Sequence, residues 1–176
     1  MIIAGEAALR VVGLFYVLSG VLVVRSLAAS GLADAAYSAI MGKPPHPAER
    51  AREVWLAVSS VLIAAGGLAL VLLLDVAAVL FILSAVLQIA YLGVIAPRFF
   101  DPHDAPDAAG RAKTWNAAIV YLVATALVVL AARGGVLRPW HDAPVWLLGA
   151  AGAALLAGIG WTVWALGLRR TLGQGE

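Results

Sequence analysis

The sequence lacks cysteine altogether and has few charged residues. With no thiol among its 176 residues, the chain excludes internal disulfide bonds, thiolate metal sites and cysteine-ligated iron–sulfur clusters. Charged residues make up 12% of the chain, whereas a soluble domain has about 25%. The apolar fraction is 63% and the mean hydropathy is +0.96. This composition excludes an ordinary soluble domain and predicts an integral membrane protein in contact with the lipid bilayer.

Long apolar runs are what the sequence has in abundance. From Val54 to Ile95 it contains one charged residue, Asp75, and one strongly polar residue, Gln88. A single transmembrane helix needs about 20 apolar residues, so this run is long enough for two. With three further runs, the expected spans are about 9–27, 54–74, 76–95, 114–132 and 145–168. We therefore expect one integral membrane domain over residues 1–176, an all-α polytopic bundle of five transmembrane helices.

The first apolar run is interpreted as a true span. A cleaved signal peptide begins with basic residues that precede its apolar centre. Here Met1–Ala8 contains Glu6 but no lysine or arginine, and Arg25 follows the apolar run instead. The polarity is the reverse of that of a signal peptide, so residues 9–27 are expected to remain in the membrane.

A short interfacial helix is expected after this first span. Leu32, Ala36 and Ile40 recur four residues apart, as apolar residues on one face of a helix do. Gly42 and the prolines that follow it would end the helix. The pattern predicts a helix of about residues 31–41 that lies on the membrane surface.

The basic residues predict the orientation of the chain. Cytoplasmic loops carry an excess of lysine and arginine. If there are five spans, one side of the membrane holds nine of the 12 basic residues, namely Arg25, Lys43, Arg50, Arg52, Arg98, Arg111, Lys113, Arg169 and Arg170. The sequence therefore predicts the amino end outside and the carboxyl end inside, in the cytoplasmic (inner) membrane of a bacterium. These residues form no continuous patch, which argues against a nucleic acid partner.

Asp75 separates the second span from the third, and no glycine or proline lies beside it. An aspartate in a turn bonds local backbone groups and stays hydrated. The span lengths favour this position, at the outer interface. The alternative is an Asp75 inside the membrane that faces a partner, which would make it a functional residue.

The two central loops suggest an internal repeat. Residues 45–57 and 102–117 both contain Pro-His, then alternating alanine and basic residues, then tryptophan. Spans two and three would then form one hairpin and spans four and five its copy. The glycine pair Gly66-Gly67 is a candidate break in span two, but span four has no matching pair.

The loop between spans three and four gathers one imidazole and three carboxylates within residues 101–107. His103, Asp101 and Asp104 are the candidate ligands if this loop binds zinc or manganese. The spacing matches no established metal site, so we interpret the loop as a hydrated connection. All three histidines of the chain fall in loops, so paired histidines cannot hold a haem between its spans and no cofactor is expected.

Small residues and one amide are the candidates for a partner interface. Small side chains let two transmembrane helices approach closely. The sequence offers Gly149, Gly152, Ala153 and Gly158 in span five. Gln88 in span three must find hydrogen-bond partners, either at a helix interface or along a pathway. We expect partner membrane subunits or self-association through these residues.

Three classes of function remain open. The small size and apolar spans favour a noncatalytic accessory subunit of a larger inner-membrane transport or electron-transfer complex. The alternative is a small homo-oligomeric transporter or channel, in which Gln88, Ser84 and the glycines of span two would face a shared path. A membrane enzyme using residues 101–107 is disfavoured, because no nucleophile has an adjacent base.

Overall fold

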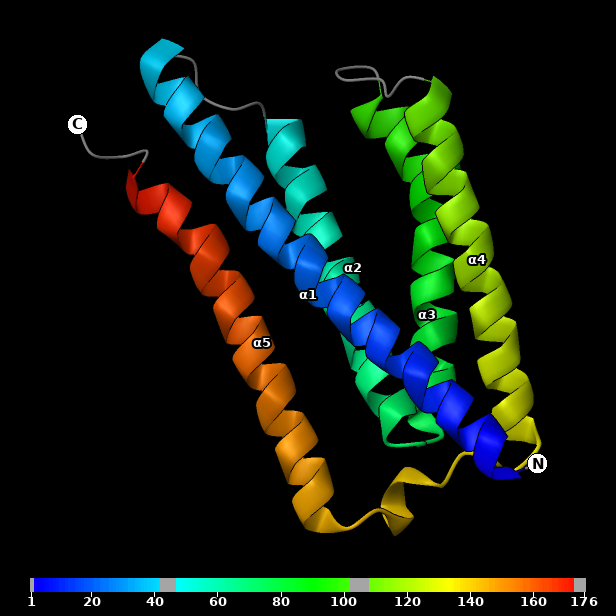
Figure 1. Cartoon of the computed structure of the whole chain (residues 1–176). Helices are drawn as coiled ribbons and strands as arrows, with labels where there is room; N and C mark the ends of the chain where they lie inside the picture. The colour runs from blue at the N-terminus through cyan, green and yellow to red at the C-terminus, as the bar shows by residue number, and fades with distance from the viewer. Residues whose placement is uncertain (1, 42–46, 102–107, 173–176) are drawn as a thin grey trace.

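The computed structural model describes the backbone of residues 2–41, 47–101 and 108–172. These residues form five long α-helices, one π-helix and one short 3-10 helix (Figure 1). The α-helices are α1 (Ile2–Met41), α2 (Pro47–Val71), α3 (Val76–Ala90), α4 (Ala108–Arg133) and α5 (Val145–Leu172). The π-helix η1 (Tyr91–Phe100) continues α3, and the 3-10 helix η2 (Trp140–Asp142) precedes α5. No β-strand occurs in this part of the chain.

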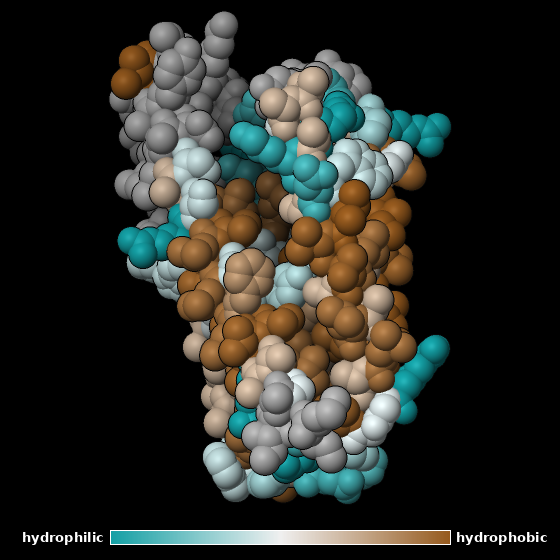
Figure 2. Space-filling model, turned by 45° about the vertical axis from the view of Figure 1, so that its right-hand side comes forward, coloured by the Kyte–Doolittle hydropathy of each residue, from teal (hydrophilic) through white to brown (hydrophobic). Residues whose placement is uncertain are grey.

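Five of these helical segments are long and apolar enough to cross a membrane. They are Gly5–Gly31, Glu49–Val71, Val76–Phe100, Ala108–Arg133 and Val145–Trp164. In Figure 2, hydrophobic residues occupy the middle of the molecule and hydrophilic residues gather toward its two ends. The all-α bundle of five transmembrane helices predicted from the sequence is confirmed.

Consecutive helices run in opposite directions, so the loops and the helix termini gather at two ends of the bundle. We call the end with Gly5, Asp75 and Arg133 the Asp75 end, and the end with Glu49, Asp101 and Ala108 the Asp101 end. In Figure 1, α1 begins at the Asp75 end and α5 finishes at the Asp101 end. An odd number of crossings requires this arrangement.

Residues 31–41 are helical, as predicted, but they are not a separate element. They continue α1, which is one unbroken helix of 40 residues. At 1.5 Å per residue it is about 60 Å long, roughly twice the hydrocarbon thickness of a bilayer. The sequence between Ile2 and Met41 contains no proline, and a single glycine such as Gly31 costs a helix only about 1 kcal/mol. Nothing therefore ends the helix where the first span ends.

The closest helix contact is between α1 and α2. A Cβ atom added at Gly67 would lie 2.6 Å from the carbonyl oxygen of Gly13, and one added at Gly13 would lie 2.7 Å from that of Gly67. Seven residues farther along α1, a Cβ at Gly20 would lie 2.6 Å from the carbonyl oxygen of Ser60. The two backbones touch at both places, so these glycines are required for packing. Gly66 and Gly67 leave α2 unbroken.

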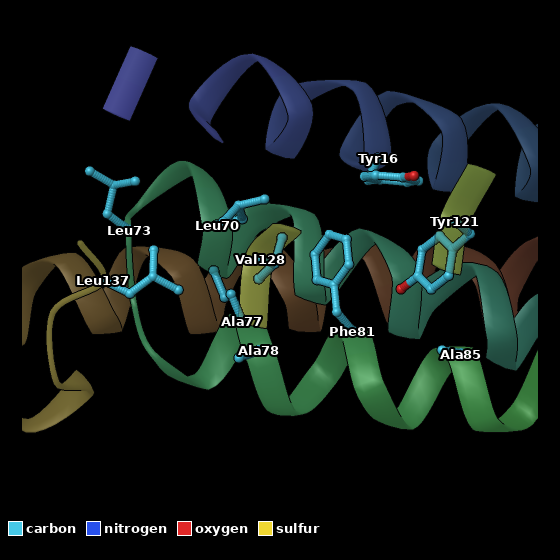
Figure 3. Close-up of a cluster of buried hydrophobic side chains, with 11 residues drawn as sticks. Tyr16, Leu70, Leu73, Ala77, Ala78, Phe81, Ala85, Tyr121, Val128 and Leu137 are labelled. Atoms are coloured by element: carbon cyan, nitrogen blue, oxygen red, sulfur yellow. The ribbon is translucent and has the colours of Figure 1, made fainter. Parts of the chain in front are cut away.

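Three aromatic rings join α1, α3 and α4 in the interior (Figure 3). Tyr16 meets Phe81 and Tyr121 edge-on, with ring centroids 5.3 and 5.1 Å away. Phe81 and Tyr121 stack in parallel at 5.4 Å. Toward the Asp75 end, Leu70 and Val128 are fully buried. This half of the bundle interior is apolar, and a cavity of about 510 Å³ lined by residues of α1 and α4, Val128 among them, remains on its Asp75 side.

The turn between α2 and α3 is made by ordinary residues, as the sequence predicts. Leu73 adopts a φ of 55°, a left-handed conformation that costs a residue with a Cβ roughly 1 kcal/mol or more. Backbone hydrogen bonds hold it there. The Arg138 amide donates to the Leu73 carbonyl at 2.7 Å, and the Asp75 amide donates to the Arg138 carbonyl at 2.8 Å. The turn is therefore fixed by the distant loop that leads to α5.

Asp75 lies in this turn, so its predicted position is confirmed. Its carboxylate accepts a hydrogen bond from the backbone amide of Trp140 at 3.0 Å. The expected bond to a local backbone group is replaced by a bond to a residue far along the chain. Asp75 thus fastens the loop before α5 to the α2–α3 turn.

We expect Asp75→Ala to release the Trp140 amide while leaving the bundle folded. A hydrogen bond of this kind contributes about 0.5–1.5 kcal/mol, so amide exchange at Trp140 should accelerate about two- to tenfold. Hydrogen exchange with mass spectrometry measures it. Asp75→Asn keeps an acceptor oxygen and should preserve most of the protection. Unchanged exchange in Asp75→Ala would show that the bond does not hold the loop.

The π-helix η1 extends the third span beyond its predicted end at residue 95. Pro97 lacks an amide hydrogen, and in an α-helix its ring would collide with the carbonyl of Gly93. The wider π turn moves that carbonyl away, and its bonds skip five residues, as in the 2.8 Å bond from the Asp101 amide to the Ala96 carbonyl. Tyr91 in η1 stacks on Trp55 of α2 with ring centroids 6.0 Å apart.

Candidate functional site

The small residues predicted as a partner interface lie on α5, where they have free space. A Cβ added at Gly149, Gly152 or Gly158 would meet nothing within 4 Å, and Ala153 is exposed. They do not share one face, however. Gly158 lines a groove between α5 and the α1–α2 pair, together with Gly20 and other residues.

The outward face of α5 carries a more regular pattern, which we call the α5 seam. Its members alternate four and three residues apart, and all are exposed: Trp146, Ala150, Ala153, Ala157, Gly160 and Trp164. Alternation of four and three is the spacing at which one helix packs along another. From Trp146 to Trp164 the seam is about 27 Å long at 1.5 Å per residue, close to the thickness of the hydrocarbon core. Small residues form its middle and tryptophans its ends.

Of this seam, the sequence reasoning placed only Ala153 among the predicted interface residues. That choice rested on small side chains four residues apart, and these occur on more than one side of the helix. The signal that finds the seam is the alternating spacing itself, and it is readable in the sequence. Knowing which side faces away from α1 and α2 required the structure.

Gln88 lies on the inward side of α3, half-buried, on the same face as Phe81 and Ser84. Its amide makes no hydrogen bond to any residue that the structure describes. Ser84 is 1% exposed and Tyr121 is 3% exposed. Their hydroxyl groups also lack a hydrogen-bond partner within the described chain, although Ser84 lies beside the Tyr121 hydroxyl. Two hydroxyl groups, those of Ser84 and Tyr121, are therefore buried side by side, and Gln88 follows one turn farther along α3.

Other hydroxyl groups in the spans behave differently. Ser60, Thr125 and Thr162 each donate to the carbonyl four residues earlier in their own helix, at 2.7, 2.9 and 2.8 Å. This is the usual way in which a serine or threonine is satisfied inside a transmembrane helix. Ser84 does not use it. Its hydroxyl is available to a group outside its own helix.

Of the metal-ligand candidates, Asp101 pairs with an arginine side chain of the same chain. Its carboxylate accepts a hydrogen bond from the Arg111 guanidinium at 2.7 Å and forms an ion pair with it. The pair joins the end of η1 to the first turns of α4. His103 and Asp104 lie outside the described residues. Among residues 2–41, 47–101 and 108–172, no three histidine or acidic side chains are placed to hold a metal ion.

The predicted repeat is not visible in the packing. α2 packs against α3, whereas α4 packs against α3 and α5 packs against α1 and α2. Figure 1 shows α4 and α5 on opposite sides of the bundle, joined by the long loop that passes beneath the α2–α3 turn. The two hairpins are therefore not equivalent units in the fold.

No protein family, curated protein or solved structure matches this chain. What the fold defines is a class: the chain is an α-helical integral membrane protein with five membrane-spanning helices. Its apolar outer surface is in contact with lipid. The finer assignment depends on its exposed α5 seam and its buried polar groups.

Proposed function

We propose that this chain is a noncatalytic accessory subunit of a larger inner-membrane transport or electron-transfer complex. Its α5 seam binds a transmembrane helix of another subunit. The observation that supports this most directly is how little of α5 its own chain covers. Within the span on α5, 6% of the residues are buried, against 17–33% in the other four.

The α1–α2 contact shows how this chain uses small residues elsewhere. Gly13 and Gly20, seven apart on α1, face the backbone of α2 at Gly67 and Ser60. Hydrocarbon gives helices no hydrophobic reason to associate, so close backbone approach and good packing supply the attraction. The α5 seam repeats this small-residue arrangement on a face that no described helix covers.

Ala153→Leu should weaken binding of the partner subunit, because the larger side chain holds the two helices apart at the middle of the α5 seam. We expect a loss of about 1–3 kcal/mol of association free energy, the usual cost of overpacking, which lowers the association constant about 5- to 150-fold and reduces co-purification accordingly. Native mass measurement after gentle detergent extraction reads this out.

Ala126→Leu is the matched control for that experiment. Ala126 is an exposed alanine on α4 that lies away from the α5 seam. This variant should keep the complex intact. Equal losses in both variants would mean that the seam is not the interface.

The runner-up is a small homo-oligomeric transporter or channel, which the unsatisfied polar groups Ser84, Gln88 and Tyr121 favour. The same native mass measurement separates the two functions. A hetero-complex supports the accessory role, and an assembly of identical chains supports the runner-up. A lone monomer in gentle detergent would contradict both.

A further inference from the structure

We propose that the space between α1 and α4 near the Asp75 end is a phospholipid site, in which an acyl chain of a bilayer lipid lies. We call this space the α1–α4 groove. Its volume is about 510 Å³, and its lining extends from Gly5 to Val12 on α1 and from Ala124 to Ala131 on α4, with Val136 of the following loop. The accessory function uses the outer face of α5, so this site is independent of it.

The groove exists because small residues stand where two helix pairs meet. α1 packs against α2, and α4 packs against α3. Four of the nine lining residues are glycine or alanine, namely Gly5, Ala8, Ala124 and Ala131. Such side chains are too short to fill the space between the two pairs. Val128 is fully buried at the inner side of the groove and Leu127 is 58% exposed, so the groove opens sideways to the surrounding lipid.

The groove lies within one leaflet of the bilayer. Tyr16 of α1 and Tyr121 of α4 stand one turn beyond it, with ring centroids 5.1 Å apart, and close it toward the middle of the bundle. From Gly5 to Val12 it is about 10 Å long at 1.5 Å per residue, which fits within half of the roughly 30 Å hydrocarbon core. A protein partner would need a larger surface, since specific interfaces bury about 1,000 Å² or more.

The chemistry of the lining selects hydrocarbon. Every described residue that lines the groove is glycine, alanine, valine or leucine. Water does not fill an apolar cavity, and at the measured cost per unit volume a void of this size would cancel the whole stability of a typical domain. A quinone ring or a peptide would leave polar groups there without partners. A saturated acyl chain has no such groups.

Two arginines supply the complement to a phosphate headgroup. Arg133 and Arg138 lie on either side of Val136 in the sequence, and both are exposed. Neither side chain forms an ion pair with a residue that the structure describes. The carboxylate of Glu6 at the same end is already paired with Arg10 at 4.0 Å. Arginine donates strong hydrogen bonds to phosphate oxygens, so a lipid whose chain lies in the groove has its headgroup at the cationic end.

Native mass spectrometry tests the site. The protein is reconstituted into vesicles of phosphatidylethanolamine and phosphatidylglycerol and then released in a gentle detergent. The fraction of chains that carry one phospholipid is followed during delipidation. Ala131→Phe places a ring in the groove and should weaken this retention about tenfold. Ala8→Phe does the same from α1, and it is the second probe if the first variant does not fold.

Ala126→Phe and Ala7→Phe are the matched controls, because both alanines are exposed on the same two helices and neither lines the groove. These variants should keep the lipid. If the unaltered protein retains no phospholipid, or if the groove variants lose no more of it than the controls, the proposal is wrong.

The two arginines are tested with the same measurement. Arg133→Gln and Arg138→Gln should each weaken retention about fivefold, whereas Arg98→Gln makes the same charge change at the Asp101 end and should not. Equal effects in all three would overturn the headgroup contact. Ala153→Leu in the α5 seam should leave the lipid in place, so this proposal and the accessory function can fail separately.

Discussion

Phe81→Ala is expected to lower the free energy of unfolding by roughly 3 kcal/mol. Phe81 is fully buried and contacts rings from α1 and α4 at once. In a bilayer the separated helices remain in hydrocarbon, so no transfer to water contributes, and the loss comes from packing alone. The cavity left by a ring costs about 2 kcal/mol at ~24 cal/mol per Å³, and each aromatic contact adds about 0.5–1.5 kcal/mol.

The measurement is denaturation in mixed micelles followed by circular dichroism. Phe99→Ala is the control, because Phe99 is 59% exposed and should change stability by about 0.5 kcal/mol or less. A similar small effect for Phe81→Ala would show that the three-ring cluster does not hold α1, α3 and α4 together.

Gly67→Ala is expected to force α1 and α2 apart. The added methyl group would lie 2.6 Å from the Gly13 carbonyl oxygen and 2.8 Å from the Val17 amide nitrogen. Both are backbone atoms, which cannot move without moving α1. Overpacking costs about 1–3 kcal/mol, against a gain of about 1 kcal/mol from the better helix propensity of alanine. We expect a net loss of stability of up to about 2 kcal/mol.

Gly149→Ala isolates the helix-propensity contribution. It is the same substitution in α5, where the new methyl group would meet nothing within 4 Å, so isolated subunits should be unchanged or slightly more stable. Unfolding of both variants in the same micelles gives the comparison. If Gly67→Ala matched Gly149→Ala, the backbone contact between α1 and α2 would not be a source of stability.

The spans were predictable because the signal for them is local. A run of about 20 apolar residues must cross the hydrocarbon as a helix, whatever surrounds it. The predicted spans 114–132 and 145–168 fall within α4 and α5, which extend farther because nothing in the flanking sequence ends them. The turn at Asp75 followed from the same arithmetic. The π-helix was not predicted, since a proline near the end of a span is equally compatible with a helix that simply ends there.

The role of each small residue was not predictable in the same way. Gly67 was considered as a break in the second span or as part of a transport path, yet it is the residue that lets the α1 backbone approach α2. Gly158 was grouped with Ala153, yet the two lie on different sides of α5. Likewise, Gln88 was recognised as exceptional, but the packing of α3 against α4 instead places Ser84 beside the Tyr121 hydroxyl.

The amino-acid sequence by itself determined that this protein is dissolved in lipid and crosses it five times, because the cost of unpaired polar groups in hydrocarbon acts on each segment separately. Only the tertiary structure decided which glycines touch a backbone, which polar groups meet, and which face of α5 is left open. A small side chain has the same composition and hydropathy whether a helix or a lipid chain lies against it. What distinguishes the two is the position of residues far apart in the chain, which is set by the packing of the whole bundle.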